Sequence, residues 1–88
     1  MTSDEDLKNA RSGGRNLSGA DLEGAKLKGV NLENADLSRA NLHNSYLHYA
    51  NLRNANLSGA DLSGAYVFQA NFEGANLKNT NLTCHMTQ

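Results

Sequence analysis

An apolar residue recurs every five positions, without interruption, from Leu17 to Leu82. Ala stands two positions before this central residue in ten of the fourteen units, and Asn or Asp stands one position before it in eleven. The repeating unit is therefore A-(D/N)-L-x-x, and it extends over residues 15–84. The fourteen centres are Leu17, Leu22, Leu27, Leu32, Leu37, Leu42, Leu47, Leu52, Leu57, Leu62, Val67, Phe72, Leu77 and Leu82.

A period of five residues matches neither of the regular secondary structures. Five residues advance about 140° beyond a full turn of an α-helix, so the centres would be spread over every side of it. Along an unbroken strand, successive centres would point to opposite faces. The centres can share one interior if each unit is a short extended segment that ends in a corner.

In that geometry the centre and the small residue two positions before it point inward, and the other three positions face water. Stacked coils would pair backbone to backbone about 4.8 Å apart, as parallel strands do. The corner would be a type II turn, whose second central residue needs a positive φ. Gly occupies that position in six units and Asn in four, and both residue types tolerate it.

The tandem A-(D/N)-L-x-x units of residues 15–84 resemble the pentapeptide-repeat proteins. This resemblance implies an all-β fold, a right-handed quadrilateral parallel β-helix in which four units make one coil. Fourteen units would give about 3.5 coils, or about 4 if the register extends toward the N-terminus. Family members often dimerise through the C-terminal coil, and an uncovered end of stacked strands is adhesive in any case.

Two structures are open for residues 1–14. Leu7 and Ala10 are in phase with the repeat, although Ser12 would then occupy a centre, so this segment could be a degraded first half-coil. The alternative is a short helix, because Ser3 followed by Asp6 resembles a capping box and glycines at 13 and 14 would end it. A cap of either kind is favoured over a free tail, and residues 85–88 are expected to form a C-terminal tail.

With twenty residues in each coil, the sequence can be divided among four faces, and one face departs from the repeat. The three exceptions to the Asn/Asp rule all belong to the face whose centres are residues 27, 47 and 67, which we call face three. The outward residues singled out there are Lys26, Lys28, Tyr46, His48, Tyr49, Tyr66 and Phe68. We interpret them as a partner-binding strip; the alternative is that the rings only stabilise the stacked coils.

Further outward positions suggest structural roles. Glu33, Arg53 and Glu73 should form a surface ion-pair ladder, and the Asn/Asp columns should hydrogen-bond the corners. His43, His48, Cys84 and His85 are too scattered for a metal site, and Cys84 is expected to be an outward-facing free thiol. We expect no metal and no cofactor.

The remaining composition argues against several functions. No catalytic motif is present, and a core of Leu and Ala leaves no evident substrate pocket, so an enzyme is not expected. The net charge is −1, with six acidic and six basic residues in residues 15–84, which disfavours direct binding to nucleic acid or to an anionic membrane. An acidic N-terminus and no apolar run of about 20 residues favour a cytoplasmic protein.

The expected function is a non-catalytic protein-interaction or scaffold module that binds a protein partner or forms a homodimer. The resemblance suggests one alternative, a DNA mimic that modulates a DNA-binding enzyme such as gyrase, although that role needs abundant negative charge. A second alternative is a structural spacer without a specific partner.

Overall fold

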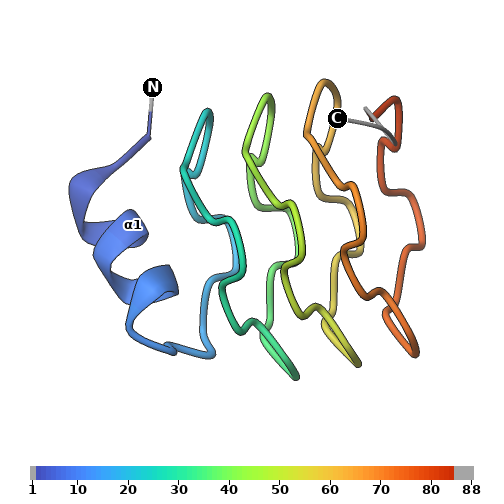
Figure 1. The fold of residues 1–88 in the computed structure, drawn as a ribbon, viewed down its shortest axis with the longest axis horizontal. Coiled ribbons are helices and arrows are strands. Elements are labelled where there is room, and N and C mark those ends of the chain that lie inside the picture. Colours follow the sequence, from blue (N-terminus) through green and yellow to red (C-terminus); the bar gives the residue numbers. More distant parts are fainter. Residues whose placement is uncertain (1, 85–88) are drawn as a thin grey trace.

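The repeat region winds into a solenoid of stacked coils with one helix, α1 (Asp4–Arg11), across its N-terminal end (Figure 1). The computed structural model describes residues 2–84. The expected tail 85–88 and His85 therefore lie outside the described residues. The all-β expectation was incomplete, because α1 precedes the coils.

Parallel backbone bridges join residues that are twenty positions apart. Ten such pairs are formed, from Asn16 with Asp36 to Asp61 with Asn81. In each pair, the amide of the residue on the later coil donates to the earlier coil, as Tyr46 N does to Ala25 O at 2.8 Å, and the amide that follows the residue on the earlier coil donates to the later one. Each straight side is only a few residues long, so within residues 2–84 the bridges stay single and no continuous strand forms.

The corners have the turn geometry that the sequence predicts. The second corner residue has a positive φ in thirteen units, from Gly19 to Asn79. In each of these units the amide three positions after the centre donates to the carbonyl of the centre, as when Ala50 N donates to Leu47 O at 3.0 Å. A hydrogen bond of this span and a positive φ at the second central residue define a type II turn.

The Asn or Asp before each centre braces the following corner. In ten units its side-chain oxygen accepts a hydrogen bond from the amide two positions later, as Asn51 Oδ1 does from Arg53 N at 3.0 Å. This is an Asx turn, which only a short side chain with a terminal oxygen can form. The expectation that these columns bond the corners is confirmed.

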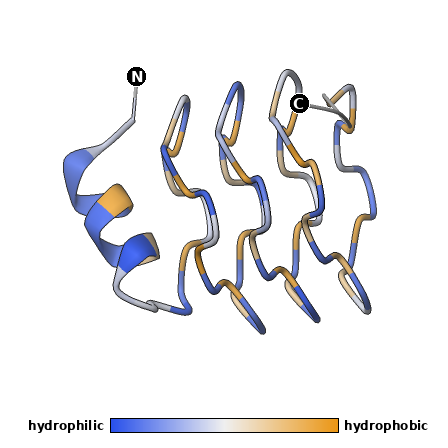
Figure 2. Ribbon diagram, in the orientation of Figure 1, coloured by the Kyte–Doolittle hydropathy of each residue, from blue (hydrophilic) through white to orange (hydrophobic). Residues whose placement is uncertain are grey.

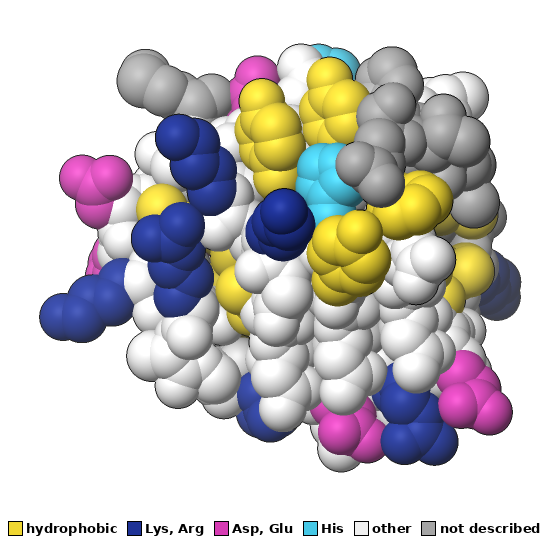
Figure 3. All heavy atoms as spheres, viewed as in Figure 1, with side chains coloured by type: hydrophobic (Ala, Val, Ile, Leu, Met, Phe, Trp, Pro, Cys, Tyr) yellow, Lys and Arg dark blue, Asp and Glu magenta, His cyan; other side chains and the backbone are white. Residues whose placement is uncertain are grey.

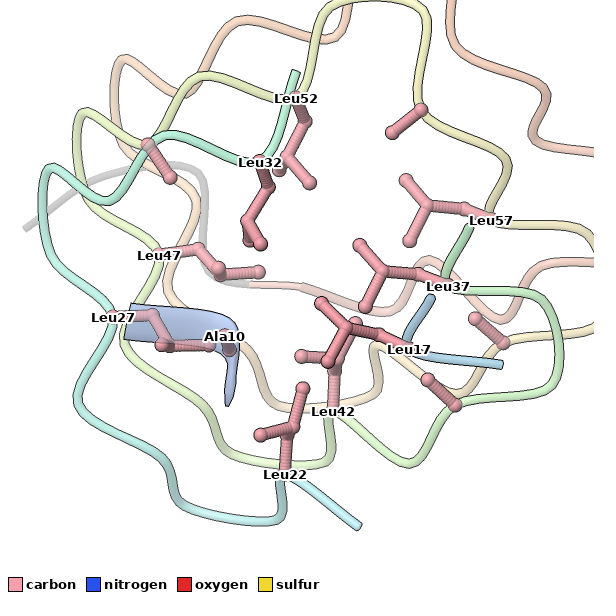
Figure 4. Close-up of a cluster of buried hydrophobic side chains, with 14 of the residues drawn as sticks. Ala10, Leu17, Leu22, Leu27, Leu32, Leu37, Leu42, Leu47, Leu52 and Leu57 are labelled. Atoms are coloured by element: carbon pink, nitrogen blue, oxygen red, sulfur yellow. The ribbon is translucent and has the colours of Figure 1, made fainter. Parts of the chain in front are cut away.

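The interior is a column of leucines. The leucine centres from Leu17 to Leu62 are at most 1% exposed, and Figure 4 shows labelled leucines pointing inward from the surrounding coil walls. Apolar and polar residues alternate along every coil as the inward and outward positions require (Figure 2). Burial declines toward the last coil, where Phe72 and Leu77 are partly buried and Leu82 is 46% exposed.

Residues 4–11 are helical rather than a half-coil. Ser3 is the N-cap, and its Oγ accepts from Asp6 N at 3.3 Å. Leu7 and Ala10 do point toward the core, but they do so from the inner side of α1, and Ala10 is fully buried. Apolar residues three apart share one face of a helix, so the same pair fits both interpretations of the sequence.

Helix α1 and its cap also satisfy backbone groups of the first coil that have no preceding coil to pair with. Ser3 N donates to Asp21 O at 2.9 Å, and Asp21 N donates to Asp6 Oδ2 at 2.8 Å. The Arg11 guanidinium donates to Lys26 O through Nε at 3.1 Å and through Nη2 at 2.9 Å. The N-terminal edge is thereby closed to further pairing at these positions.

Truncating a central leucine should cost far more stability than truncating the last one. We expect Leu42→Ala to lower the free energy of unfolding by about 2–5 kcal/mol, because it leaves a cavity in the closed column. Leu82→Ala is the matched control and should change it by less than about 1 kcal/mol, because that side chain is half exposed. Urea denaturation measures both free energies of unfolding. Equal losses of stability in the two variants would contradict a core that is fully buried in its central coils and exposed at the last coil.

One Asx turn should be visible in a titration. The Ser38 hydroxyl, and then its backbone amide, donate to Asp36 and hold the pKa of that carboxyl below its ordinary value. Since the folded pKa is depressed, this group contributes stability that is present above its unfolded pKa and lost as the pH falls through the folded pKa.

Replacing the serine tests this directly. We expect Ser38→Ala to raise the pKa of Asp36 toward its ordinary value, as measured by NMR titration of the carboxyl carbon. Asp61 is the internal control, because its own depressed pKa depends on Ser63. An unchanged Asp36, or an equal change at Asp61, would show that the serine hydroxyl is not the cause.

Candidate functional site

Face three brings its predicted residues together in vertical columns. Lys26 bridges to Tyr46, and Tyr46 bridges to Tyr66, so these three side chains lie one above another on successive coils. The second column, two positions later in each unit, consists of Lys28, His48 and Phe68. The face therefore changes from cationic on its first coil to aromatic on the next two.

Three rings of this face form one stack. Tyr46 and Tyr66 have centroids 5.1 Å apart with an interplanar angle of 15°. His48 lies 5.6 Å from Tyr66 and 6.2 Å from Tyr46, with angles of 14° and 29°. Offset stacking at these distances is the favourable arrangement for aromatic pairs. The stack holds each ring in a fixed orientation on the surface.

A second group of side chains lies beside the stack. The rings of Tyr49 and Phe68 meet edge to face, with centroids 5.7 Å apart and an angle of 83°. Lys28 Nζ lies 5.8 Å from the centroid of the Tyr49 ring, within the range of a cation–π contact. Tyr49 occupies a corner at φ 63°, where Gly or Asn usually stands. Bulky residues rarely adopt this conformation, and here it places the Tyr49 ring on the outer corner of the face.

The two groups border a surface hollow of about 510 Å³. It is lined by Lys26, Lys28, Tyr46, His48 and Tyr49, and Figure 3 shows hydrophobic, basic and histidine side chains gathered on one face. Tyr46 is 42% exposed and Tyr49 is 48% exposed. Of the seven predicted residues, five thus line one hollow, and the remaining two, Tyr66 and Phe68, support its rings from the next coil.

Two features of this face could not be predicted from the sequence pattern. His48 Nδ1 is buried and has no hydrogen-bond partner. The exposed Arg11 guanidinium reaches the face from α1 through its bonds to Lys26 O, adding a third cation beside the two lysines. The position of Arg11 in the last turn of a helix could have indicated that it lies near this face. The sequence, however, left open whether that segment is a helix or a half-coil.

The outward residues of the remaining faces have structural roles or are dispersed. Arg53 lies between Glu33, at 3.3 Å, and Glu73, at 3.1 Å, so the predicted ion-pair ladder is present; because it is exposed, its contribution is modest. His43 Nδ1 lies 2.8 Å from Ser63 Oγ. Residues 2–84 contain no group of three His, Cys, Asp or Glu side chains placed to hold a metal ion. In the same range no helix has the length and apolarity to cross a membrane.

The last coil carries a second, purely apolar hollow. It measures about 300 Å³ and is lined by Val67, Phe72, Leu77, Leu82 and Cys84. The expectation of an outward Cys84 was wrong, because its thiol turns toward the hollow and donates to a backbone carbonyl of the preceding coil at 3.2 Å. Burial, and then the nearby Asp61 carboxylate, raise the pKa of this thiol. The thiol is therefore less reactive than a free surface cysteine.

The chain matches the family model described as Pentapeptide repeats (8 copies) over residues 16–48 and 45–83. A search of curated proteins gave no match.

Similar solved structures come from cyanobacteria and from a plant. A pentapeptide repeat protein from Nostoc Pcc 7120 is 36% identical, with a TM-score of 0.73, over 94% of this chain and 74% of that one. One from the cyanobacterium Cyanothece 51142 is 37% identical, with a TM-score of 0.68, over 82% of this chain and 54% of that one. One from the Arabidopsis thaliana thylakoid lumen is 31% identical, with a TM-score of 0.57, over 99% of this chain and 63% of that one.

A double-mutant cycle should measure how much the ring stack stabilises the solenoid. We expect Tyr46→Ala and Tyr66→Ala to be coupled by about 0.5–1.5 kcal/mol in the free energy of unfolding, because each removes half of a stacked pair. Tyr46→Ala combined with Lys78→Ala, on another face, is the control and should be additive within about 0.5 kcal/mol. A coupling no larger than in the control would mean that the stack does not stabilise the fold.

Proposed function

The chain belongs to the pentapeptide repeat family, whose fold is the right-handed quadrilateral β-helix, and within that family we propose that it is a non-catalytic module that binds another protein through face three. We further propose that residues 15–84 make about three and a half coils, at four units per coil. Ten bridges with a spacing of twenty residues support that number, and α1 occupies the position of a further half-coil.

The single observation that carries the functional proposal is the pair of half-exposed tyrosines over a preformed hollow. Tyrosine is enriched at protein interfaces because it offers a large apolar surface with a polar tip. Stacking already fixes the neighbouring rings, so binding would immobilise few additional rotamers. Elsewhere the outward positions hold mainly Asn, Asp, Ser and Gly, which form the corners.

A cost in stability also points to function. Lysine and tyrosine have no side-chain oxygen that can accept from the corner amide as Asn and Asp do, so three corners of face three forgo the Asx hydrogen bond. Such a bond contributes about 0.5–1.5 kcal/mol. Ring stacking offsets the loss for Tyr46 and Tyr66, whereas the side chain of Lys26 has no ring that could stack in the same way. A purely stabilising role therefore accounts for the tyrosines and leaves the lysine unexplained.

Self-association through the last coil is a second candidate function. Its observation is the apolar hollow around Leu82, which no residue within 2–84 covers. In the earlier coils the amide of each centre donates to the following coil, as Leu47 N does to Tyr66 O, and the same pattern would leave the amides of the last coil available to a second copy. A second copy that packs against this end would bury both the apolar lining of the hollow and the backbone hydrogen-bonding groups of the last coil.

A DNA mimic and a structural spacer both have less support. Imitation of DNA, as a modulator of an enzyme such as gyrase, would need a strongly acidic surface, whereas residues 15–84 hold equal numbers of acidic and basic groups. A structural spacer would account for the stacked tyrosines but not for Lys26, which forgoes the corner hydrogen bond without stacking. Our proposal includes a cytoplasmic location, no small-molecule substrate and no direct nucleic-acid binding.

Removing the rings should abolish partner binding without abolishing the fold. We expect the triple variant Tyr46→Ser, Tyr66→Ser and Phe68→Ser to lose the proteins captured by the intact chain from an extract of its source. The matched control replaces the ion-pair ladder, with Glu33→Ser, Arg53→Ser and Glu73→Ser, and should retain them. Circular dichroism establishes that both variants fold.

Light scattering on the same proteins separates the two candidate surfaces. A dimer that persists in the face-three variant and dissociates in Leu82→Asp would assign self-association to the last coil. Capture and oligomeric state that are both unchanged in the face-three variant would overturn the proposal that face three is the binding surface.

A further inference from the structure

We propose that the hollow on face three binds an acidic peptide segment in which a large apolar side chain is flanked by carboxylates. This inference rests on the proposed function and names the chemistry of the partner. It is carried by the placement of unpaired cations against a preformed aromatic surface.

The cations of the hollow are complementary to the carboxylates of such a peptide. Lys26 and Lys28 are exposed, two positions apart in one extended unit, which spaces them about 7 Å along the chain. Neither makes an ion pair with any residue in 2–84, and no carboxylate lines the hollow. Arg11 reaches the same edge from α1 and uses two of its donors on a backbone carbonyl, so its charge is also uncompensated by a carboxylate. An acidic ligand would neutralise this cluster.

The aromatic rings are complementary to the apolar side chain of the peptide. Tyr46 lies directly above Lys26, one coil further along the axis, and Tyr49 presents its exposed ring beside it on the same coil. Adjacent coils are about 4.8 Å apart, so a bound segment can place a carboxylate at the lysines and a neighbouring Phe or Leu on the rings. Lys28, held 5.8 Å from the Tyr49 centroid, joins the cationic and aromatic halves of the hollow.

His48 adds a directional contact. Its Nδ1 is buried without a partner. In the tautomer with the proton on Nε2, no ring N–H is left buried without an acceptor, and the Nε2–H can donate to a ligand. A carboxylate or carbonyl oxygen of the peptide can accept from that N–H.

A single-stranded nucleic acid fits this site less well. Sequence-tolerant binding of that kind needs open ring faces for successive bases and a cationic track along the backbone. Here the rings already stack on one another with centroids 5.1–6.2 Å apart, and the cations are confined to one end of the face. The described solenoid also has no excess of positive charge, so binding would release few counterions from a nucleic-acid strand.

The test uses the full chain and a fluorescein-labelled peptide, Gly-Asp-Glu-Phe-Glu-Leu-Glu-Gly, followed by fluorescence anisotropy. We expect saturable binding that weakens as NaCl is raised from about 50 to about 300 mM. Lys26→Glu and Lys28→Glu should each weaken it by about tenfold or more. Lys78→Glu is the matched control, because Lys78 occupies the same slot as Lys28 on another face, and it should bind as the intact chain does.

Two further probes separate the ionic from the aromatic contribution to binding. A peptide with Gln and Asn in place of Glu and Asp should not bind. Tyr49→Ala should lower the affinity for the acidic peptide, and the remaining binding should still weaken as salt is added. Equal weakening by Lys26→Glu and Lys78→Glu would overturn the site in favour of diffuse attraction. Tighter binding of a single-stranded oligonucleotide of the same charge would overturn the peptide assignment.

Failure of this inference can be told from failure of the proposed function. If the ring variant loses its captured partner while Lys26→Glu and Lys28→Glu retain it, face three binds a protein that is not recognised through acidic groups. If the ring variant also retains the partner, the proposed function itself is wrong.

Discussion

The hydrogen-bond ladder between coils is the interaction on which the rest of this structure depends. Each coil donates amides to the next and accepts from it at a spacing of twenty residues, from Asn16 with Asp36 onward. Because the ladder keeps this register from coil to coil, every inward leucine meets another leucine and every corner meets another corner. One slipped residue would move a leucine into an outward slot, so the apolar core and the ladder enforce the same register.

The ladder also determines how a surface can be built on this fold. An outward side chain has its nearest neighbours in the same slot twenty residues before and after it, so a surface feature takes the form of a column. Arg53 between Glu33 and Glu73 is one such column, and Lys26 below Tyr46 and Tyr66 is another. Substitutions twenty residues apart therefore act on one site, although they are distant in the sequence.

Much of this could be predicted because the repeat assigns each residue type a place. The inward leucines, the corner residues with positive φ, the Asx bonds and the grouping of rings on face three all follow from the five-residue unit and the coil length. The repeat gives no guidance where it stops. Leu7 and Ala10 suit a helix and a half-coil equally, and Cys84, at the last corner, turns its thiol inward to a backbone carbonyl instead of outward as the repeat predicts. The buried Nδ1 of His48 depends on ring packing, which spacing alone does not determine.

The two ends of the solenoid differ in a way that bears on where partners can bind. At the first coil, α1 supplies donors and acceptors to Asp21 and Lys26, so that end cannot add a strand there. At the last coil, the described residues leave Leu82 half exposed beside the apolar hollow. Within residues 2–84, the last coil is therefore the end available to a partner that extends the ladder, whereas a partner that contacts outward side chains is directed to face three. Because the two modes use different surfaces, one chain could be bound at both, and variants at Leu82 and at Lys26 should then act independently.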